Sequence, residues 1–323
     1  MHSPICKRSL KIFSRLLCVL IGLSFSQVTI ADEGGVPFWM SGQYASMAAV
    51  PMATGWSLVA IPYVYSGKAD KSKTFQHGTS LNAGVSTRES LVLMQLGYVG
   101  EEKILGGQPY IGLGWGPGSN TTTASISVTN PSTQLNRANT SNGSTDVYPL
   151  ASLTWSQGNN NYKAYVTGDI PVGTYNRTSL ASIGIGHAAM DAGGGYTYLN
   201  TTTGLEFSGV LGATYNWMNS QTNYKNGIDS HLDWSISQFV SQNWQVGIAG
   251  YGYYQLTADT GGGDKVGAFK SRIAAIGPQI GYLFNIGTKQ AYINLRAYKE
   301  FWAQNRVEGY ATIATISIPL GKQ

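Results

Sequence analysis

Segments of about ten residues in which apolar and polar side chains alternate constrain this fold more than any other feature of the sequence. Two of the clearest lie at 244–256 and 292–302, and in the second Ile293 and Leu295 flank Asn294. Successive side chains of a β-strand point to opposite faces, whereas in a helix these apolar residues would spiral around the axis. The sequence therefore predicts strands that each have one apolar and one polar face.

The connectors between these segments alternate in length. Short turns interleave with connectors of twelve residues or more. Outer-membrane barrels have tight periplasmic turns and long outer loops, so this alternation predicts a transmembrane antiparallel β-barrel in the bacterial outer membrane. The short connectors are 157–161, 200–204, 241–243 and 285–289, and the long ones are 171–186, 218–229 and 257–270.

The pattern predicts about fourteen strands, an even number that places both ends of the barrel in the periplasm. The uncertain region is 108–128: as one bent strand it gives an odd total, and the loss of one more strand gives twelve. A soluble β-sandwich is the alternative, and it needs a second sheet over every apolar face. The predicted strands are 56–65, 78–87, 90–99, 108–116, 121–128, 148–155, 162–170, 187–199, 205–217, 230–240, 244–256, 272–284, 292–302 and 310–320.

The first thirty-one residues have the order of a secretory signal. Basic residues precede an apolar run at 16–25, which is too short to cross a bilayer as a helix. Without this segment the net charge falls from +5 to +1, so the basic isoelectric point does not indicate a nucleic-acid partner. Cys6 and Cys18 also lie in it, so the mature chain is expected to have no disulfide and no cysteine metal site.

Composition agrees with a sheet that has one face in lipid. Charged residues make up 11% of the chain, whereas a typical soluble domain has about a quarter. The predicted barrel, residues 55–323, would therefore have outer-membrane lipid as a partner. Aromatic residues near strand ends, among them Trp217, Trp244 and Trp302, suit the aromatic girdles of such barrels.

Residues 32–54 precede the first clear strand and are unusually apolar for a periplasmic tail. Phe38, Trp39, Tyr44 and Met47 are their main large side chains. Either this segment folds into the lumen as a small plug or it stays a disordered tail. These four residues are the predicted plug contacts.

Polar residues on the inward faces of the predicted strands are candidates for lining the lumen and contacting a ligand. Asp229, His231 and Asp233 share one face, where they could bind a metal or simply line a wet pore. Ionisable groups at membrane depth must pair or be hydrated, which predicts a network of Arg296, Glu300, Asp191 and Glu206. The full predicted set is Asp191, Glu206, Asp229, His231, Asp233, Tyr251, Tyr253, Arg296, Tyr298 and Glu300.

The sequence gives no basis for an enzymatic function. His187 and His231 are the candidate bases of the mature chain, but no spacing connects either to a nucleophilic serine. The Gly-rich run at 193–195 does not open a helix after a strand, so it is not a phosphate-binding loop. We expect no catalytic residues, no metal site and no cofactor.

Motifs spread over most of the mature chain also resemble those of a known family. The chain resembles the outer-membrane transporters grouped under the meta-pathway of phenol degradation. The motifs are Pro-Phe-Trp-Met at 37–40, Ala-Ala-Val-Pro at 48–51, Gly-Trp-Ser at 55–57, Thr-Gly-Asp-Ile-Pro-Val-Gly at 167–173, Ile-Gly-Ile-Gly-His at 183–187, Gly-Gly-Tyr-Thr-Tyr-Leu at 194–199, Asn-Gly-Ile-Asp-Ser-His-Leu-Asp-Trp at 226–234, Phe-Lys-Ser-Arg at 269–272, Gly-Pro-Gln-Ile-Gly-Tyr at 277–282 and Asn-Arg at 305–306.

The resemblance implies passive uptake of small hydrophobic or aromatic compounds through the barrel. The alternative is a structural or surface-interaction barrel with a closed lumen, whose long outer loops bind a partner. Conductance and ligand binding separate the two, because a closed barrel shows neither.

Overall fold

The structure is a computed structural model that describes residues 37–74, 80–129, 132–261 and 270–320. The predicted signal, 1–31, lies outside these residues, as do residues 32–36 of the predicted N-terminal segment. Among the described residues, no helix is long and apolar enough to cross a membrane.

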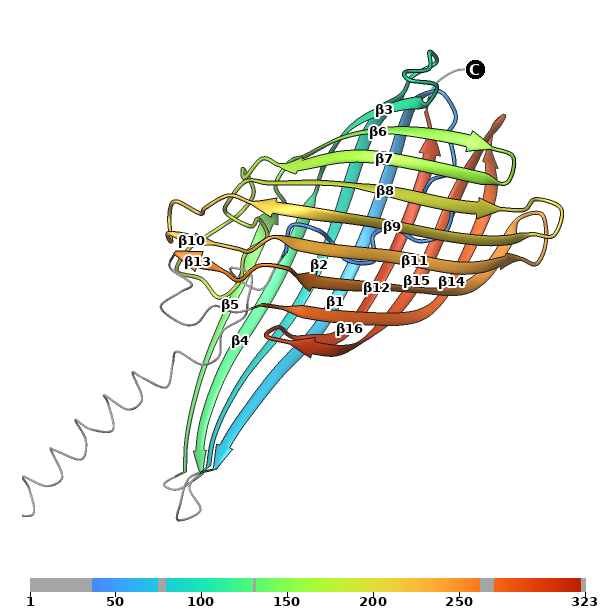
Figure 1. Ribbon diagram of the computed structural model, residues 1–323. Coiled ribbons are helices and arrows are strands. Elements are labelled where there is room, and N and C mark those ends of the chain that lie inside the picture. Colours follow the sequence, from blue (N-terminus) through green and yellow to red (C-terminus); the bar gives the residue numbers. More distant parts are fainter. Residues whose placement is uncertain (1–36, 75–79, 130–131, 262–269, 321–323) are drawn as a thin grey trace, which may run out of the picture.

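One antiparallel sheet of fourteen strands forms nearly the whole fold. Strand β1 pairs with β16 on one side and with β2 on the other, so the sheet closes into a ring of twelve strands (Figure 1). The ring contains β1 (Gly55–Thr74), β2 (Ser80–Val99), β3 (Gln108–Trp115), β6 (Tyr148–Gln157), β7 (Asn160–Asp169), β8 (Ala189–Leu199), β9 (Leu205–Asn216), β11 (Asp229–Phe239), β12 (Trp244–Gln255), β14 (Arg272–Ile286), β15 (Lys289–Gln304) and β16 (Glu308–Pro319). Outside it, β4 (Pro117–Thr129) and β5 (Ser132–Ser144) extend the sheet, and β10 (Tyr224–Lys225) pairs with β13 (Thr260–Gly261).

The closed barrel is confirmed, and its ring has the alternative count of twelve strands. The predicted strands 78–87 and 90–99 are one strand, β2, because β1 pairs along its entire length. The polar residues between them look like a turn in the sequence, yet Glu89 pairs with Tyr65 on one side and Asn120 on the other. The predicted strands 108–116 and 121–128 are β3 and β4, which follow one another with a break at Gly116.

The outer face of the ring is apolar and the inner face is polar, which is the reverse of a soluble protein. Leu211, Ile236 and Leu295 are 60%, 44% and 46% exposed, whereas the acidic side chains of the same strands are buried. Such an outer face suits lipid. Because the sheet closes on itself, the soluble sandwich is excluded. The predicted girdle residues Trp217, Trp244 and Trp302 are also exposed.

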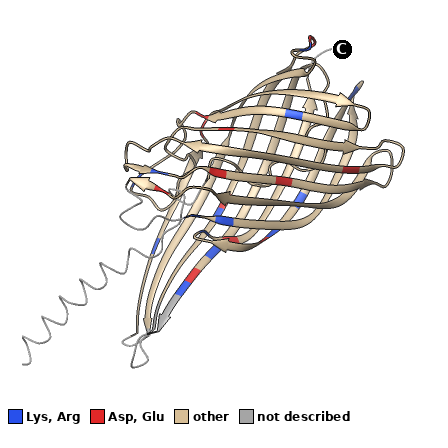
Figure 2. Cartoon of the chain, viewed as in Figure 1, with Lys and Arg blue, Asp and Glu red and all other residues tan. Residues whose placement is uncertain are grey.

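The ends of β1 and β2 continue beyond the ring and form a four-stranded projection with β4 and β5 (Figure 1). The face that is apolar on the ring, with Val64 and Val92, becomes polar on the projection, with Ser86, Ser125 and Ser127. Charged residues are sparse on the barrel and several lie on the projection (Figure 2). The lipid-facing band therefore ends where the projection begins.

Short and long connectors lie at opposite ends of the barrel, as predicted. The tight turns from β6 to β7, β8 to β9 and β11 to β12 gather at one end (Figure 1). The long connectors after β7, β9 and β12 lie at the other end, beside the projection. In outer-membrane barrels the end with long loops faces outward, so we expect the projection to face the cell exterior.

Candidate functional site

Residues 37–54, which we call the inner segment, lie inside the barrel and have no regular secondary structure. Their backbone N–H groups therefore need partners from the barrel wall. Polar side chains of three strands accept these hydrogen bonds. Gly42 N donates to Asp233 Oδ1 at 2.8 Å, Met47 N to Glu206 Oε1 at 2.9 Å, and Ala49 N to Thr197 Oγ1 at 3.0 Å.

Basic side chains of the wall hold the carbonyl groups of the same segment. Arg296 Nε and Nη2 donate to the carbonyl oxygens of Gly42 and Gln43 at 2.9 and 2.6 Å. Lys163 Nζ donates to the carbonyl oxygen of Ala48 at 3.4 Å. Acidic groups thus face the segment's donors and basic groups face its acceptors, which fixes its course along one side of the lumen.

Gly42 lies where the inner segment passes close to two tyrosine rings of the wall. Its φ angle is +80°, which favours glycine, and a Cβ atom there would come within 2.8 Å of the Tyr251 ring and 2.9 Å of the Tyr298 ring. The backbone can therefore approach both rings closely only because this residue has no side chain.

Trp39 anchors the start of the inner segment to the wall and is only 3% exposed. Its indole stacks on the His231 ring, with centroids 3.6 Å apart. His231 Nε2 lies 3.0 Å from Asp191 Oδ2, and this is the one salt bridge among the described residues. Tyr165 donates to Asp191 Oδ1 at 2.7 Å and also stacks on Trp39. The rings of His231 and Tyr165, which both contact the Asp191 carboxylate, therefore hold the indole in place.

Tyr44, another predicted plug residue, packs beside Trp39 with ring centroids 5.8 Å apart. Lys163 Nζ lies 4.9 Å from the centroid of the Tyr44 ring. Burial, and to a smaller degree the charges of Asp233 and Asp191, raise the pKa of Tyr44 well above its ordinary value of 10.0. Its phenol is neutral at physiological pH. The predicted plug residues Phe38, Trp39, Tyr44 and Met47 all line the cavity described below.

All ten predicted lumen-lining residues lie inside the barrel, each at most 4% exposed. Tyr251, Arg296 and Glu300 border the open cavity. The other seven do not border it, and several of them hold or contact the inner segment. The seven are Asp191, Glu206, Asp229, His231, Asp233, Tyr253 and Tyr298. Ligand contact by any of these residues stays a prediction.

Asp229, His231 and Asp233 share the inward face of β11 as predicted, but their side chains have different partners. Asp229 accepts hydrogen bonds from Tyr253 and Asn216, whereas Asp233 accepts them from the inner segment. Within the described ranges, no group of three histidine, cysteine or acidic residues is arranged to hold a metal ion.

The expected network of Arg296, Glu300, Asp191 and Glu206 is wrong in its pairing. The hydrogen bonds of Arg296 go to backbone carbonyls, Asn294 and Thr315 rather than to these carboxylates. Glu300 accepts hydrogen bonds from the hydroxyls of Tyr65 and Tyr251, each at 2.7 Å. The strands hold the four charges apart, so each one is satisfied separately by other partners, among them His231 for Asp191 and the inner segment for Glu206 and Arg296.

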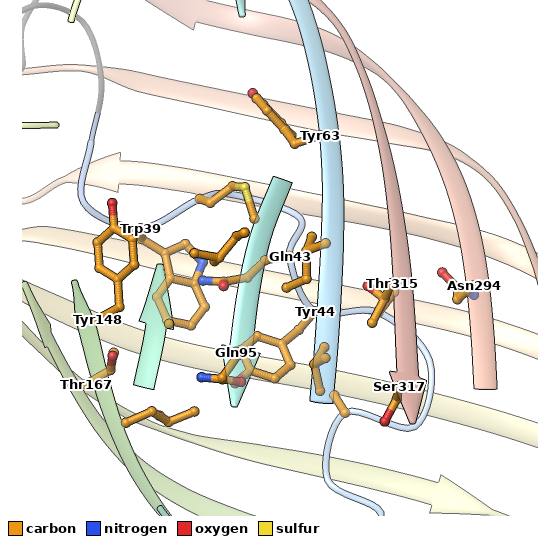
Figure 3. Close-up of a pocket in the computed structure, with 18 of the residues that line it drawn as sticks. Trp39, Gln43, Tyr44, Tyr63, Gln95, Tyr148, Thr167, Asn294, Thr315 and Ser317 are labelled. Atoms are coloured by element: carbon orange, nitrogen blue, oxygen red, sulfur yellow. The ribbon is translucent and has the colours of Figure 1, made fainter. Parts of the chain in front are cut away.

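A cavity of about 930 Å³ remains between the inner segment and the opposite wall. In the ring, β2 lies opposite β11, six strands away in either direction. The segment follows the β11 side, so the free space borders β1, β2, β3 and β6. Figure 3 shows Trp39 and Tyr44 of the segment in this space, with Tyr63, Gln95 and Tyr148 around it.

This opposite wall is apolar, which the sequence prediction missed. Its lining side chains are mostly aliphatic or aromatic, with a few polar groups. A signal was present, because 56–65 and 90–99 are apolar at nearly every position and so lack the alternation of the other strands. Both faces of these strands are apolar, one toward lipid and one toward the cavity. The apolar lining residues include Val59, Ile61, Tyr63, Tyr65, Val85, Leu91, Leu93, Val99, Tyr110, Tyr148 and Leu150.

A closed antiparallel ring with an apolar outer face and a polar interior is an outer-membrane β-barrel, and the predicted location in the bacterial outer membrane is confirmed. The family model described as "Putative MetA-pathway of phenol degradation" matches residues 72–316, and the chain belongs to this family. Its fold is similar to that of the COG4313 outer membrane channel from Pseudomonas putida F1, with a TM-score of 0.58 and 12% identity over 84% of this chain and 97% of that one. The two proteins thus share a β-barrel fold.

Two further solved structures show weaker likenesses. The β-domain of the Bordetella autotransporter BrkA has a TM-score of 0.45 and 8% identity over 83% of this chain and 100% of that one. The CymD monoaromatic hydrocarbon channel has a TM-score of 0.41 and 8% identity over 90% and 96%. No curated protein matches the sequence.

Proposed function

We propose that this protein is a passive channel for small hydrophobic or aromatic compounds, which pass between the inner segment and the apolar wall. The observation that carries the proposal is the asymmetry of the lumen. Its polar side is occupied by hydrogen bonds to the inner segment, whereas the side left open is lined by Val59, Ile61, Tyr63 and Leu93.

The size and lining of the cavity suit one or a few small rings. Ligand pockets commonly measure about 300–1,000 Å³. Burial of an aromatic ring removes about 150–250 Å² from water, which is worth roughly 4–6 kcal/mol before the cost of association. A dissociation constant of about 1 mM needs about 4 kcal/mol net, so after the cost of association we expect millimolar or weaker binding. Binding of that strength lets a molecule enter and also leave, as conduction requires.

The projection offers an approach to this cavity from the outside. On its inner face, Ala69 and Val85 pair across β1 and β2, and Ala124 pairs with Val85 from β4. Ile126 continues the same face toward the tip. Val85 also borders the cavity, so one apolar surface extends from the projection into the barrel.

In this function the inner segment acts as a plug that narrows the lumen. It covers the charged residues of β8, β9 and β11, which would otherwise line a wide aqueous pore. Removal of these charges from the transport path favours apolar molecules over ions. The narrow path that remains has mainly tyrosine, aliphatic and neutral polar side chains, and a few charged residues, among them Glu89, Arg296 and Glu300, border it.

Uptake by intact cells tests the proposal. A strain that lacks the gene and a complemented strain are compared for uptake of toluene, phenol and naphthalene at limiting concentration, with arabinose as a polar control. We expect complementation to raise uptake of the ring compounds several-fold and to leave arabinose unchanged. Equal uptake of every ring compound by the two strains, together with a lack of ligand binding by the purified barrel, favours the closed-lumen alternative.

A further inference from the structure

The acidic side chains of the lumen differ in whether the protein gives them hydrogen bonds, and the channel function does not explain this difference. Asp191, Asp233 and Glu300 each accept hydrogen bonds from protein donors, and so do Glu206 and Asp229. Glu89 of β2 borders the same cavity, yet no described residue donates a hydrogen bond to it. Of the two described carboxylates that border the cavity, Glu89 and Glu300, only Glu89 accepts no hydrogen bond from a described residue. Asp169 of β7 also lacks a hydrogen-bond partner among the described residues, but it does not border the cavity.

The side chains that pair with Glu89 across the sheet donate their hydrogen bonds to other groups. Tyr65, its pairing partner on β1, donates its hydroxyl to Glu300 at 2.7 Å. Asn120, its pairing partner on β4, donates its amide to the carbonyl oxygen of Ser182 at 3.2 Å. The Asn120 oxygen accepts from Thr87 and Thr122. Both cross-strand neighbours carry suitable groups, and both direct them away from Glu89.

The surroundings of Glu89 are those of a binding surface. Leu91 follows on the same face of β2, and Tyr63 lies diagonally across on β1; both border the cavity. In Figure 3 the ring of Tyr63 lies at the edge of this space, and its hydroxyl has no hydrogen-bond partner among the described residues. An apolar surface thus carries one carboxylate and one phenol hydroxyl that are free to contact a ligand.

A carboxylate on an apolar wall is costly unless a donor satisfies it. We propose that Glu89 is the polar recognition group of this channel, and that it accepts a hydrogen bond from a hydroxyl or amino group on an otherwise apolar aromatic ligand. The ring packs on Leu91 and Tyr63 while its donor points at Glu89. This inference rests on the proposed function and names the class of compound that the cavity prefers.

The test compares ligands that differ only in the donor. Binding of phenol, aniline and toluene to the full barrel in lipid nanodiscs is measured by saturation-transfer NMR, with empty nanodiscs as the reference. We expect the wild-type protein to bind phenol and aniline more tightly than toluene. Glu89→Leu should weaken phenol and aniline about tenfold, the size expected for a hydrogen bond to a charged group, and leave toluene within about twofold.

Two further variants separate recognition from structure. Glu89→Gln keeps an acceptor oxygen, so it should preserve part of the preference for phenol. Glu101→Gln changes an exposed carboxylate in the connector between β2 and β3 that does not border the cavity, and it should match the wild type. Heat-modified mobility on gels verifies that each variant forms a barrel.

The possible failures are distinguishable. If none of the three compounds binds the wild-type barrel, the proposed function fails. If all three bind and Glu89→Leu leaves the ratio of phenol to toluene affinity unchanged, the role of Glu89 is overturned while the channel proposal stands. Equal losses for phenol and toluene also overturn it, because they indicate a change in the shape of the cavity.

Discussion

The indole of Trp39 lies nearly parallel to the imidazole of His231, with an angle of 13° between the ring planes. One ring belongs to an irregular segment and the other to strand β11, 192 positions further along the chain. This contact fixes the start of the inner segment against β11 and leaves the opposite side of the lumen open.

Trp39→Ala should loosen the inner segment and widen the lumen. Loss of a buried tryptophan costs about 3–5 kcal/mol of local packing, enough to populate states in which the segment leaves the wall. Single-channel conductance in planar bilayers should rise, with more frequent openings. Trp56→Ala removes an exposed, lipid-side tryptophan and serves as the control. Identical single-channel currents for the wild type, Trp39→Ala and Trp56→Ala would mean that Trp39 does not hold the inner segment.

Asp233→Ala should free the backbone amides of Gly42 and Tyr44. Both donate to this carboxylate, and loss of an acceptor for a buried donor costs about 1–3 kcal/mol. Hydrogen exchange at residues 40–46 should accelerate roughly tenfold to a hundredfold. The control is Asp70→Ala, an exposed carboxylate of the projection. Unchanged exchange in the segment would contradict its attachment through Asp233.

Deletion of residues 38–50 should convert the narrow apolar path into a wider, cation-selective pore. Without the segment, Glu206 and Asp233 lose their backbone donors and face water. Acidic residues outnumber basic ones on that wall, so the field inside the lumen favours cations. Reversal potentials in a KCl gradient measure this selectivity. Anion selectivity, or no gain in conductance, would refute this account of the inner segment.

Ile61→Asn should reduce the uptake of ring compounds by placing an amide on the apolar wall. Ile61 borders the cavity and is 8% exposed. A polar group at this position removes part of the apolar surface that a bound ring would contact. We expect toluene uptake to fall several-fold, with the barrel still assembled. Ser86→Asn, on the outer polar face of the projection, is the matched control and should transport normally.

Ala138→Cys, on the exposed outer face of β5, should react with a membrane-impermeant maleimide added to intact cells. Gln242→Cys lies in the tight turn between β11 and β12 and should react only after the outer membrane is opened. Cys6 and Cys18 fall in the predicted signal, so these single-cysteine variants have no background label. The reverse labelling pattern would show that the barrel has the opposite orientation in the membrane.

The sequence by itself determined which way most side chains point. Because strand side chains alternate with a period of two, the inward positions of His231, Asp233 and Arg296 could be read from their apolar neighbours. The same local rule, with the lengths of the connectors, predicted a membrane barrel. The family resemblance agreed with it, and the match of the family model over 72–316 confirmed the family.

Tertiary structure alone decided what those side chains contact. Arg296 was expected to pair with acidic residues, but it holds the carbonyl of Gly42, 254 positions away, and Glu300 accepts from Tyr65, 235 positions away. Such partners depend on how twelve strands close into a ring and where the inner segment lies within it. The count of twelve, the apolar wall and the unpaired Glu89 follow from that closure, because strand periodicity fixes a side chain's direction and carries no information about what lies across the lumen.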